Sequence, residues 1–191
     1  MGATTCSIEV REKNNHFEKY LNGKGIDIGC ANDPLKIKNG NVDLWDLENG
    51  DAQYLETIDN ENYDFVYSSH CLEHMKDTEI ALYNWSRVIK KDGYVFFVVP
   101  EYILYEKMQF PSKFNTDHKS SYSYYITKGK TKRDNHFHKD DIVRILENLN
   151  MEVLEVQLED ENYDYNLSPS VDQTWHKNAL AQILFVAKKT K

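Results

Sequence analysis

Short apolar runs separated by polar turns are the clearest pattern along this chain. The strongest covers residues 94–99, and because it is apolar on both faces it indicates a central parallel strand. Further stretches with the length and composition of strands are residues 25–30, 42–45, 50–55, 63–67, 151–158 and 180–187.

Two stretches have the periodicity of main helices: residues 77–90, and the stretch that begins at Lys139 or Asp140. A short helix is expected over residues 34–38, and residues 1–22 carry a weak helical stripe as a lead-in. The inner face of the first main helix is predicted to consist of Ile80, Tyr83, Val88 and Ile89.

The order of these elements predicts an α/β fold. A β-β-β-α-β succession with short linkers is typical of a doubly wound sheet. The chain has 191 residues, enough for one domain with a sizeable core and too few for two. Residues 1–191 contain no internal repeat and are therefore expected to form a single domain.

Composition narrows the class of protein. The net charge of −8 argues against a general nucleic-acid binder. Cys6, Cys30 and Cys71 have no paired spacing, which is typical of a reduced, intracellular protein. The longest apolar run is too short to cross a bilayer and no signal segment opens the chain. A cytoplasmic location without a membrane span is therefore expected.

The run from Gly25 to Asp33 combines a buried strand with a glycine turn. Asp27 would lie at the carboxyl end of the strand, where open α/β sheets bind their ligands. Gly29 would let the backbone come close to a ligand. The short residues after it, Cys30 and Ala31, leave backbone N–H groups free to bind a carboxylate or hydroxyl. The full G-x-G-x-x-G pattern is absent, so the turn alone is a modest signal.

The second strand ends near a candidate ribose ligand. In doubly wound sheets an acid such as Asp43 binds the two ribose hydroxyls of a nucleoside, although its spacing from Gly29 is shorter than usual. Leu44 and Trp45 could wall an adenine, and a buried core tryptophan is the alternative. Asp51 could accept a hydrogen bond from an exocyclic amine, or it could be a turn residue.

The segment that follows the fourth strand allows two interpretations. His70 is a candidate general base, because an imidazole titrates near neutral pH, and orienting a substrate or capping a helix is equally open. Glu73 and His74 are expected to brace the start of a helix. The pattern His70-x-x-Glu73-His74 also matches a zinc-hydrolase signature, but the sequence singles out no third ligand.

Taken together, these pieces resemble a class I S-adenosylmethionine-dependent methyltransferase. The resemblance covers residues 20–100 closely and continues more loosely through residues 136–142. It rests on the run Gly25–Asp33, Asp43, Asp51-Ala52, the Cys-Leu-Glu-His of residues 71–74, and Asp92-Gly93-Tyr94 before an apolar strand. It implies a Rossmann-like, doubly wound sheet of seven mostly parallel strands, one of them antiparallel, with helices on both faces.

The resemblance also implies S-adenosylmethionine as the cofactor, with S-adenosylhomocysteine as the product. Residues after the first strand would hold its methionine part, Asp43 the ribose and Asp51-Ala52 the adenine, while Ser69 and His70 would face the methyl sulfonium. The cofactor-binding candidates are Asp27, Gly29, Cys30, Ala31, Asp43, Leu44, Trp45, Asp51, Ala52, Gln53, Ser69 and His70. No metal is assigned.

Residues 101–138 are longer than the single helix that a minimal fold needs. From Lys107 to Lys139, eight basic residues stand against only Asp117 and Asp134, so this segment carries +6, and aromatic residues are interleaved with them. A basic patch attracts anions and aromatic faces stack on sugars or bases, whereas a solvated loop is the alternative. Residues 101–138 and 160–177 are therefore expected to be substrate lids.

The expected function is transfer of a methyl group to oxygen or nitrogen of a small, anionic acceptor linked to a sugar, nucleotide or phosphate, as in surface-polysaccharide biosynthesis. The alternatives are a zinc hydrolase that uses His70, Glu73 and His74, and a non-catalytic subunit with a cofactor fold. The oligomeric state is left open. The catalytic candidates are His70, His118 and His136, and the substrate-binding candidates are Tyr102, Lys113, His118, Lys130, Arg133, His136 and His138.

Overall fold

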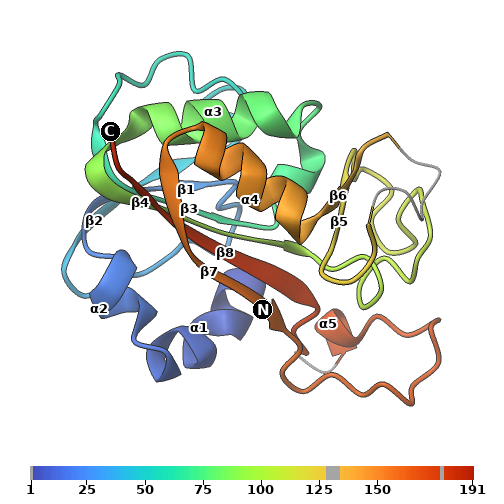
Figure 1. The fold of residues 1–191 in the computed structure, drawn as a ribbon. Coiled ribbons are helices and arrows are strands. Elements are labelled where there is room, and N and C mark those ends of the chain that lie inside the picture. Colours follow the sequence, from blue (N-terminus) through green and yellow to red (C-terminus); the bar gives the residue numbers. More distant parts are fainter. Residues whose placement is uncertain (1, 128–133, 177–178) are drawn as a thin grey trace.

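The computed structural model describes residues 2–127, 134–176 and 179–191, and it is built around one mixed sheet (Figure 1). The strands of this sheet are β1 (Gly23–Ile28), β2 (Gly40–Trp45), β3 (Tyr63–Ser69), β4 (Ile89–Pro100), β7 (Met151–Glu159) and β8 (Gln182–Lys189). They lie in the order β2-β1-β3-β4-β8-β7. β8 is antiparallel to both neighbours and the other pairs are parallel, which confirms the α/β class and the antiparallel strand.

The sheet has six strands, so the expectation of seven was wrong. Residues 50–55 form turns instead of a strand, because the segment bonds to itself. The backbone N–H groups of Tyr54 and Leu55 both donate to the carbonyl oxygen of Asp51. The Asp51 carboxylate also accepts from the N–H of Gln53. Residues 34–38, expected to be a short helix, form no helix either.

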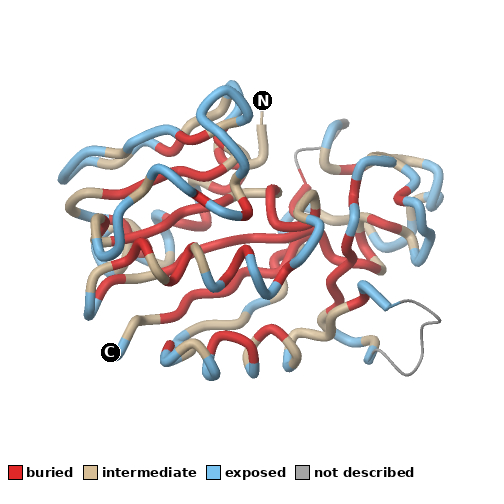
Figure 2. The backbone as a smooth tube through the Cα atoms, turned by 90° about the horizontal axis from the view of Figure 1, so that it is seen from above, coloured by how far each residue is buried: buried red, intermediate tan, exposed pale blue. Residues whose placement is uncertain are grey.

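Helices cover both faces of the sheet, as expected, with one pair on each face (Figure 1). The first pair is α1 (Ala3–Lys13) and α2 (His16–Tyr20), and the second is α3 (Thr78–Val88) and α4 (Lys139–Asn148). Side chains along β4 alternate between the two faces of the sheet and so contribute to the hydrophobic core on each face. Phe97 packs on the α3 side and Phe96 packs on the α2 side. Most residues of the central strands β1, β3 and β4 are accordingly buried, and Figure 2 shows long buried stretches through the middle of the molecule. Within the described ranges, no helix has the length and apolar character that a membrane crossing requires.

The buried face of α3 agrees only in part with the prediction. Val88 is buried as expected, and Ile89 is buried at the start of β4, but Ile80 and Tyr83 are 39% and 54% exposed. Ala81, Leu82 and Trp85 complete the face toward the sheet, at a helical spacing of three and four residues. The Asp77 carboxylate caps the start of the helix by accepting backbone N–H groups of its first turn.

The two insertions lie together near the carboxyl ends of the parallel strands (Figure 1). The first contains a separate parallel pair, β5 (Ser121–Ser123) and β6 (His136–His138), and the second contains the short helix α5 (Gln173–His176). The 3-10 turn η1 (Leu72–His74), which follows β3, contacts the first insertion. The buried carboxylate of Glu101 ties the first insertion to β4, since it accepts the backbone N–H groups of Leu104 and Tyr124. The carbonyl oxygen of Glu73 accepts those of Lys119 and Ser120.

Candidate functional site

A cavity of about 640 Å³ lies where β1, β2 and β3 end. This edge is where open α/β sheets bind their ligands. A second cavity, of about 260 Å³, shares His70 and His74 with the first. Among the sequence-predicted cofactor residues, those that line the larger cavity are Gly29, Asp51, Ala52, Gln53 and His70.

Gly29 forms the turn by which the chain leaves β1. Its φ is +77°, and a Cβ atom at this position would lie 2.6 Å from the Sγ atom of Cys71. Its N–H donates to the carbonyl oxygen of Trp45 over 2.8 Å. Glycine alone combines this backbone conformation with so close an approach of the segment after β3. Cys30 follows and is buried, and Ala31 is exposed.

Asp27 lies within the sheet and not on the cavity surface. Its side chain is buried, and its Oδ2 atom accepts the backbone N–H of Leu35 over 2.7 Å. Burial, helped by the negative charges of Asp33 and Asp46, raises the pKa of this carboxyl to about 7. Asp27 therefore holds the loop that follows Gly29 against the end of β1.

The acid that reaches the cavity from β2 is Asp46. β2 continues to Trp45, so Asp43 lies inside the strand opposite Ile26, where its carboxylate accepts from the Tyr63 hydroxyl over 2.9 Å. Asp46 follows the last strand residue, lines the cavity and accepts the N–H of Ala31 over 2.8 Å. The spacing from Gly29 was the available signal, because the longer interval to Asp46 is nearer the usual twenty or so residues.

The two apolar residues that were predicted to wall the adenine also lie outside the cavity. Leu44 is exposed outside the cavity and Trp45 is buried in the core, while Leu47 lines the cavity. The opposite wall is tied to α3. Gln53 accepts the backbone N–H of Asp77 over 2.8 Å, and the carbonyl oxygen of Ala52 accepts the indole N–H of Trp85.

His70 lies at the end of β3, between the two cavities. Its Nε2 atom is 2.8 Å from the amide oxygen of Gln182. The amide nitrogen of Gln182 donates to Glu159 and to the Ser7 hydroxyl, so the amide orientation is fixed and Nε2 of the neutral ring carries the proton. Nδ1 is then an acceptor, 3.7 Å from Oε1 of Glu73. Burial lowers the pKa of His70, which favours this neutral form. Ser69, the residue before it, lines neither cavity.

The second cavity is assembled from parts that are far apart in the sequence. α1 contributes Ala3 and Cys6, the first insertion contributes Tyr105 and His118, and the second contributes Trp175. Tyr105 and Trp175 offer aromatic faces of the kind that stack on planar or sugar rings. The helical lead-in and both insertions therefore meet around one small space beside His70.

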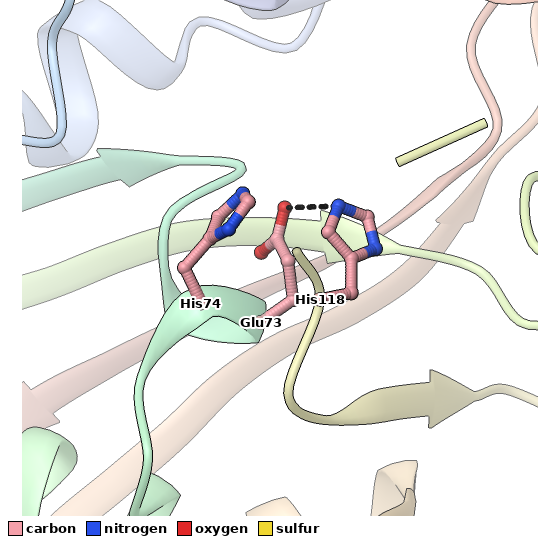
Figure 3. Close-up of side chains that lie close together, drawn as sticks. All are labelled: Glu73, His74 and His118. Atoms are coloured by element: carbon pink, nitrogen blue, oxygen red, sulfur yellow. Dashed lines mark ion pairs between the residues drawn. The ribbon is translucent and has the colours of Figure 1, made fainter. Parts of the chain in front are cut away.

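Glu73, His74 and His118 lie close together at this second cavity (Figure 3). Nε2 of His118 is 3.9 Å from Oε1 of Glu73, and its Nδ1 is 2.6 Å from the Glu106 carboxylate. Nδ1 of His74 is 2.9 Å from the Asp117 carboxylate. Burial raises the pKa of Glu73 to about 8. Burial lowers the pKa of His118, but the hydrogen bond to Glu106 and the nearby carboxylates outweigh it and raise that pKa.

The remaining candidates of the first insertion bond to the protein itself and line neither cavity. The ring of His136 is buried, with its nitrogens 2.8 Å from the Ser121 hydroxyl and 3.1 Å from the carbonyl oxygen of Ile126. His138 caps α4. The hydroxyl of Tyr102 donates to the carbonyl oxygen of Met108, and Lys113 donates to that of Pro169. Lys130 and Arg133 lie outside the described residues.

The zinc-hydrolase pattern is not arranged as that chemistry needs. His70 has a left-handed backbone at a strand end, with a φ of 55°, and Glu73 and His74 lie in the 3-10 turn η1. The two histidines therefore do not share an α-helical face, and His70 uses Nε2 to contact Gln182. The zinc-hydrolase alternative is not supported.

Similarity to known proteins indicates the family and the fold of this chain. Residues 11–156 match the family model described as "Methyltransferase domain". A search of the curated proteins finds no match. Among solved structures, a SAM-dependent methyltransferase from Archaeoglobus fulgidus has a TM-score of 0.58 at 18% identity, over 98% of this chain and 95% of its own.

Two further solved structures share the fold. A SAM-dependent methyltransferase from Methanosarcina mazei has a TM-score of 0.55 at 13% identity, over 93% of this chain and 97% of its own. The [4+2]-cyclase SpnF has a TM-score of 0.53 at 14% identity, over 94% of this chain and 80% of its own. Since one fold can host several chemistries, the chemistry of this chain has to be argued from the family match and from the site.

Proposed function

Because this chain belongs to the methyltransferase domain family, we propose that its larger cavity binds the cofactor and its second cavity holds the methyl acceptor. The chain is a SAM-dependent methyltransferase, and S-adenosylmethionine is its cofactor. When bound, this cofactor supplies a methyl group on a positively charged sulfur. The observation that carries the proposal is that the two cavities meet at His70.

The lining of the larger cavity fits a nucleoside with a charged tail. Its volume, about 640 Å³, is in the usual range for such ligands. We assign the ribose hydroxyls to the carboxylate of Asp46 and the adenine to Asp51, Ala52 and the apolar side chain of Leu47. These assignments move the predicted ribose acid and its apolar neighbour from Asp43 and Leu44 to the residues just beyond β2. The Gly29 turn, held by Asp27, would lie against the methionine part.

His70 is the proposed general base. Its Nε2 atom donates its proton in the hydrogen bond to Gln182. Nδ1 can therefore take a proton from a hydroxyl or amine of the methyl acceptor in the second cavity. Holding acceptor and cofactor on either side of this histidine supplies the alignment on which such a transfer mainly depends, worth about 7–11 kcal/mol in favourable cases.

The acceptor is proposed to be a small molecule with a ring, such as a sugar, that stacks on Tyr105 or Trp175. The expected anionic character has less support. Lys107 and Lys113 contact Tyr163 and the carbonyl oxygen of Pro169, and neither lysine lines the second cavity. Recognition of an anionic or polysaccharide-linked acceptor therefore rests on the +6 segment as a whole, including Lys130 and Arg133. The cytoplasmic location also stays a prediction from cysteine content.

Calorimetric titration with S-adenosylhomocysteine tests the cofactor assignment. We expect one-to-one binding by the unaltered chain. Asp46→Asn should weaken it by about 10- to 100-fold, because hydrogen bonds to a charged group contribute about 1.5–3 kcal/mol. Asp43→Asn is the matched control, since it changes the same residue type three positions earlier, inside β2 and outside the cavity lining, and its affinity should stay within about twofold.

If Asp43→Asn weakened S-adenosylhomocysteine binding more than Asp46→Asn did, the ribose hydroxyls would have to be assigned to Asp43 instead. Absence of binding by the unaltered chain would contradict the whole assignment and would favour the non-catalytic alternative.

A further inference from the structure

The carboxylate of Glu73 is buried without a donor to satisfy it. Its side chain is 1% exposed, and in the described part of the chain neither oxygen has a hydrogen-bond partner. Buried carboxylates are costly unless a hydrogen-bond donor, a cation or a proton compensates them. Glu73 therefore needs either a proton or a bound cation, because its described neighbours supply no hydrogen-bond donor.

The two histidines beside Glu73 are oriented by other carboxylates. His118 bonds Glu106 through Nδ1, and His74 bonds Asp117 through Nδ1. A carboxylate can only accept, so in the neutral rings Nδ1 carries the proton and Nε2 keeps its lone pair. A carboxylate on the far nitrogen is the arrangement that metal-binding histidines usually have.

The spacing suits a metal ion of ordinary size. One ligand atom from each of Glu73, His74 and His118 lies within 4.8 Å of the others, and Glu73 and His118 approach to 3.9 Å. A tetrahedral zinc ion with bonds of about 2.0–2.1 Å separates its ligand atoms by about 3.3 Å. The three side chains lie next to one another (Figure 3), and metal binding would require their ligand atoms to move closer to reach that separation.

We propose that Glu73, His74 and His118 bind a divalent transition-metal ion at the second cavity. Two imidazoles and one carboxylate form a donor set that such ions favour. The sequence pattern offered His70, Glu73 and His74 but singled out no third ligand, so no metal was assigned from it. The third ligand comes from the first insertion, which the backbone of Glu73 itself holds in place through Lys119 and Ser120.

A metal held by three protein ligands keeps at least one position open. All three ligands line the second cavity, so that position would face the proposed acceptor and could hold its oxygen or nitrogen. This role rests on the proposed function. Metal binding itself does not rest on the proposed function, because none of the three ligands belongs to the residues that we assign to the ribose or the adenine.

Titration of metal-free protein with zinc chloride, followed by calorimetry, tests the site. We expect one zinc ion per chain. Glu73→Gln keeps the shape of the side chain and should weaken binding by about 100-fold or more. Glu106→Gln, which removes only the carboxylate behind His118, should weaken it by about 10- to 100-fold.

His138→Asn is the matched control. It removes a histidine of the same insertion that lines neither cavity, and asparagine is itself a good N-cap, so zinc affinity should not change. His74→Asn is a second ligand variant at a half-buried position, for use if Glu73→Gln does not fold.

Absence of stoichiometric binding by the unaltered chain would overturn the proposal, and so would equal affinity in the unaltered chain and the ligand variants. Circular dichroism of each variant checks folding, because His74 also lines the larger cavity and its replacement can alter cofactor binding directly. Titration of the unaltered chain with S-adenosylhomocysteine separates the two proposals, because zinc binding without cofactor binding would leave the metal site standing and remove the methyl-transfer assignment.

Discussion

The two cavities that meet at His70 are built from stretches of very different length along the chain. Apart from Asp117, the larger cavity is lined by residues 29–76, from the loops that directly follow β1, β2 and β3. The second draws on residues from Gly2 to Gln182. A loop that leaves a strand is positioned by that strand, whereas the second cavity exists only once distant segments have docked.

The interactions that hold the two sides differ accordingly. The larger cavity, the proposed cofactor site, depends on a glycine turn, a buried acid and apolar packing. The acceptor side rests on buried polar pairs, above all between Arg11 of α1 and Glu159 of β7, which are 1% and 2% exposed. This contrast can be tested by substitutions on either side.

Arg11→Met should have the largest effect. It leaves the buried carboxylate of Glu159 without its cation, which typically costs about 3–5 kcal/mol of unfolding free energy. Denaturant unfolding measures the loss. Because Arg11 does not line the larger cavity, S-adenosylhomocysteine affinity of the folded variant should be unchanged. Adding Glu159→Met should restore most of the stability, and a loss below about 1 kcal/mol in the single variant would show that this pair does not anchor α1.

Asp27→Asn should change how stability depends on pH. The pKa of Asp27 is raised from 3.8 to about 7 in the folded protein, so the folded state holds this proton more tightly than the unfolded chain does. The resulting penalty is absent below pH 4, grows as pH rises and is complete above pH 7, where it amounts to about 4 kcal/mol.

Asparagine removes that penalty and can still accept from Leu35. Unfolding should therefore be measured at pH 4 and pH 8. Relative to the unaltered chain, the unfolding free energy of the variant should be higher at pH 8 than at pH 4 by up to about 4 kcal/mol. A difference that stays constant with pH would show that the Asp27 carboxyl titrates normally.

Gly29→Ala should have the smallest of these effects, about 1–3 kcal/mol of stability together with weaker S-adenosylhomocysteine binding. The added Cβ would lie 2.6 Å from both Cβ and Sγ of Cys71. Cys71→Ala in the same chain removes only the sulfur, so it should recover part of the loss. No recovery at all would place the cost in the backbone φ and the contact with the Cβ atom, and not in the contact with the sulfur.

The sequence predicts the cofactor side far better than the acceptor side. The strands and the Gly29 turn follow from local patterns, because each apolar run fixes its own pleat and each turn its own residue types. Asp43 lies inside β2 because an apolar run does not mark where that strand ends, and Asp46, the acid that we propose for the ribose, follows three positions later. The inner face of α3 was misassigned because Ile80 and Tyr83 are as apolar as the residues that face the sheet.

No local pattern could have joined His118 to Glu73. Their proximity depends on the docking of the first insertion on η1, through backbone bonds that any sequence can make. The same holds for Gln182, whose amide orientation is set by Glu159 and Ser7 from opposite ends of the chain. Such polar contacts are specified by the whole fold.

The reversed direction of β8 gives His70 an unusually firm partner. A wholly parallel sheet would present only departing strands at the reactive edge, each leading into a loop. β8 begins there, and its first residue, Gln182, is paired with Pro100 on one side and Glu159 on the other. His70, the proposed general base, is thereby held by the framework of the sheet, whereas the walls of the proposed acceptor cavity come largely from the insertions. If His70 removes the proton of the acceptor, changes in the insertions can alter acceptor choice and leave the geometry of proton removal intact.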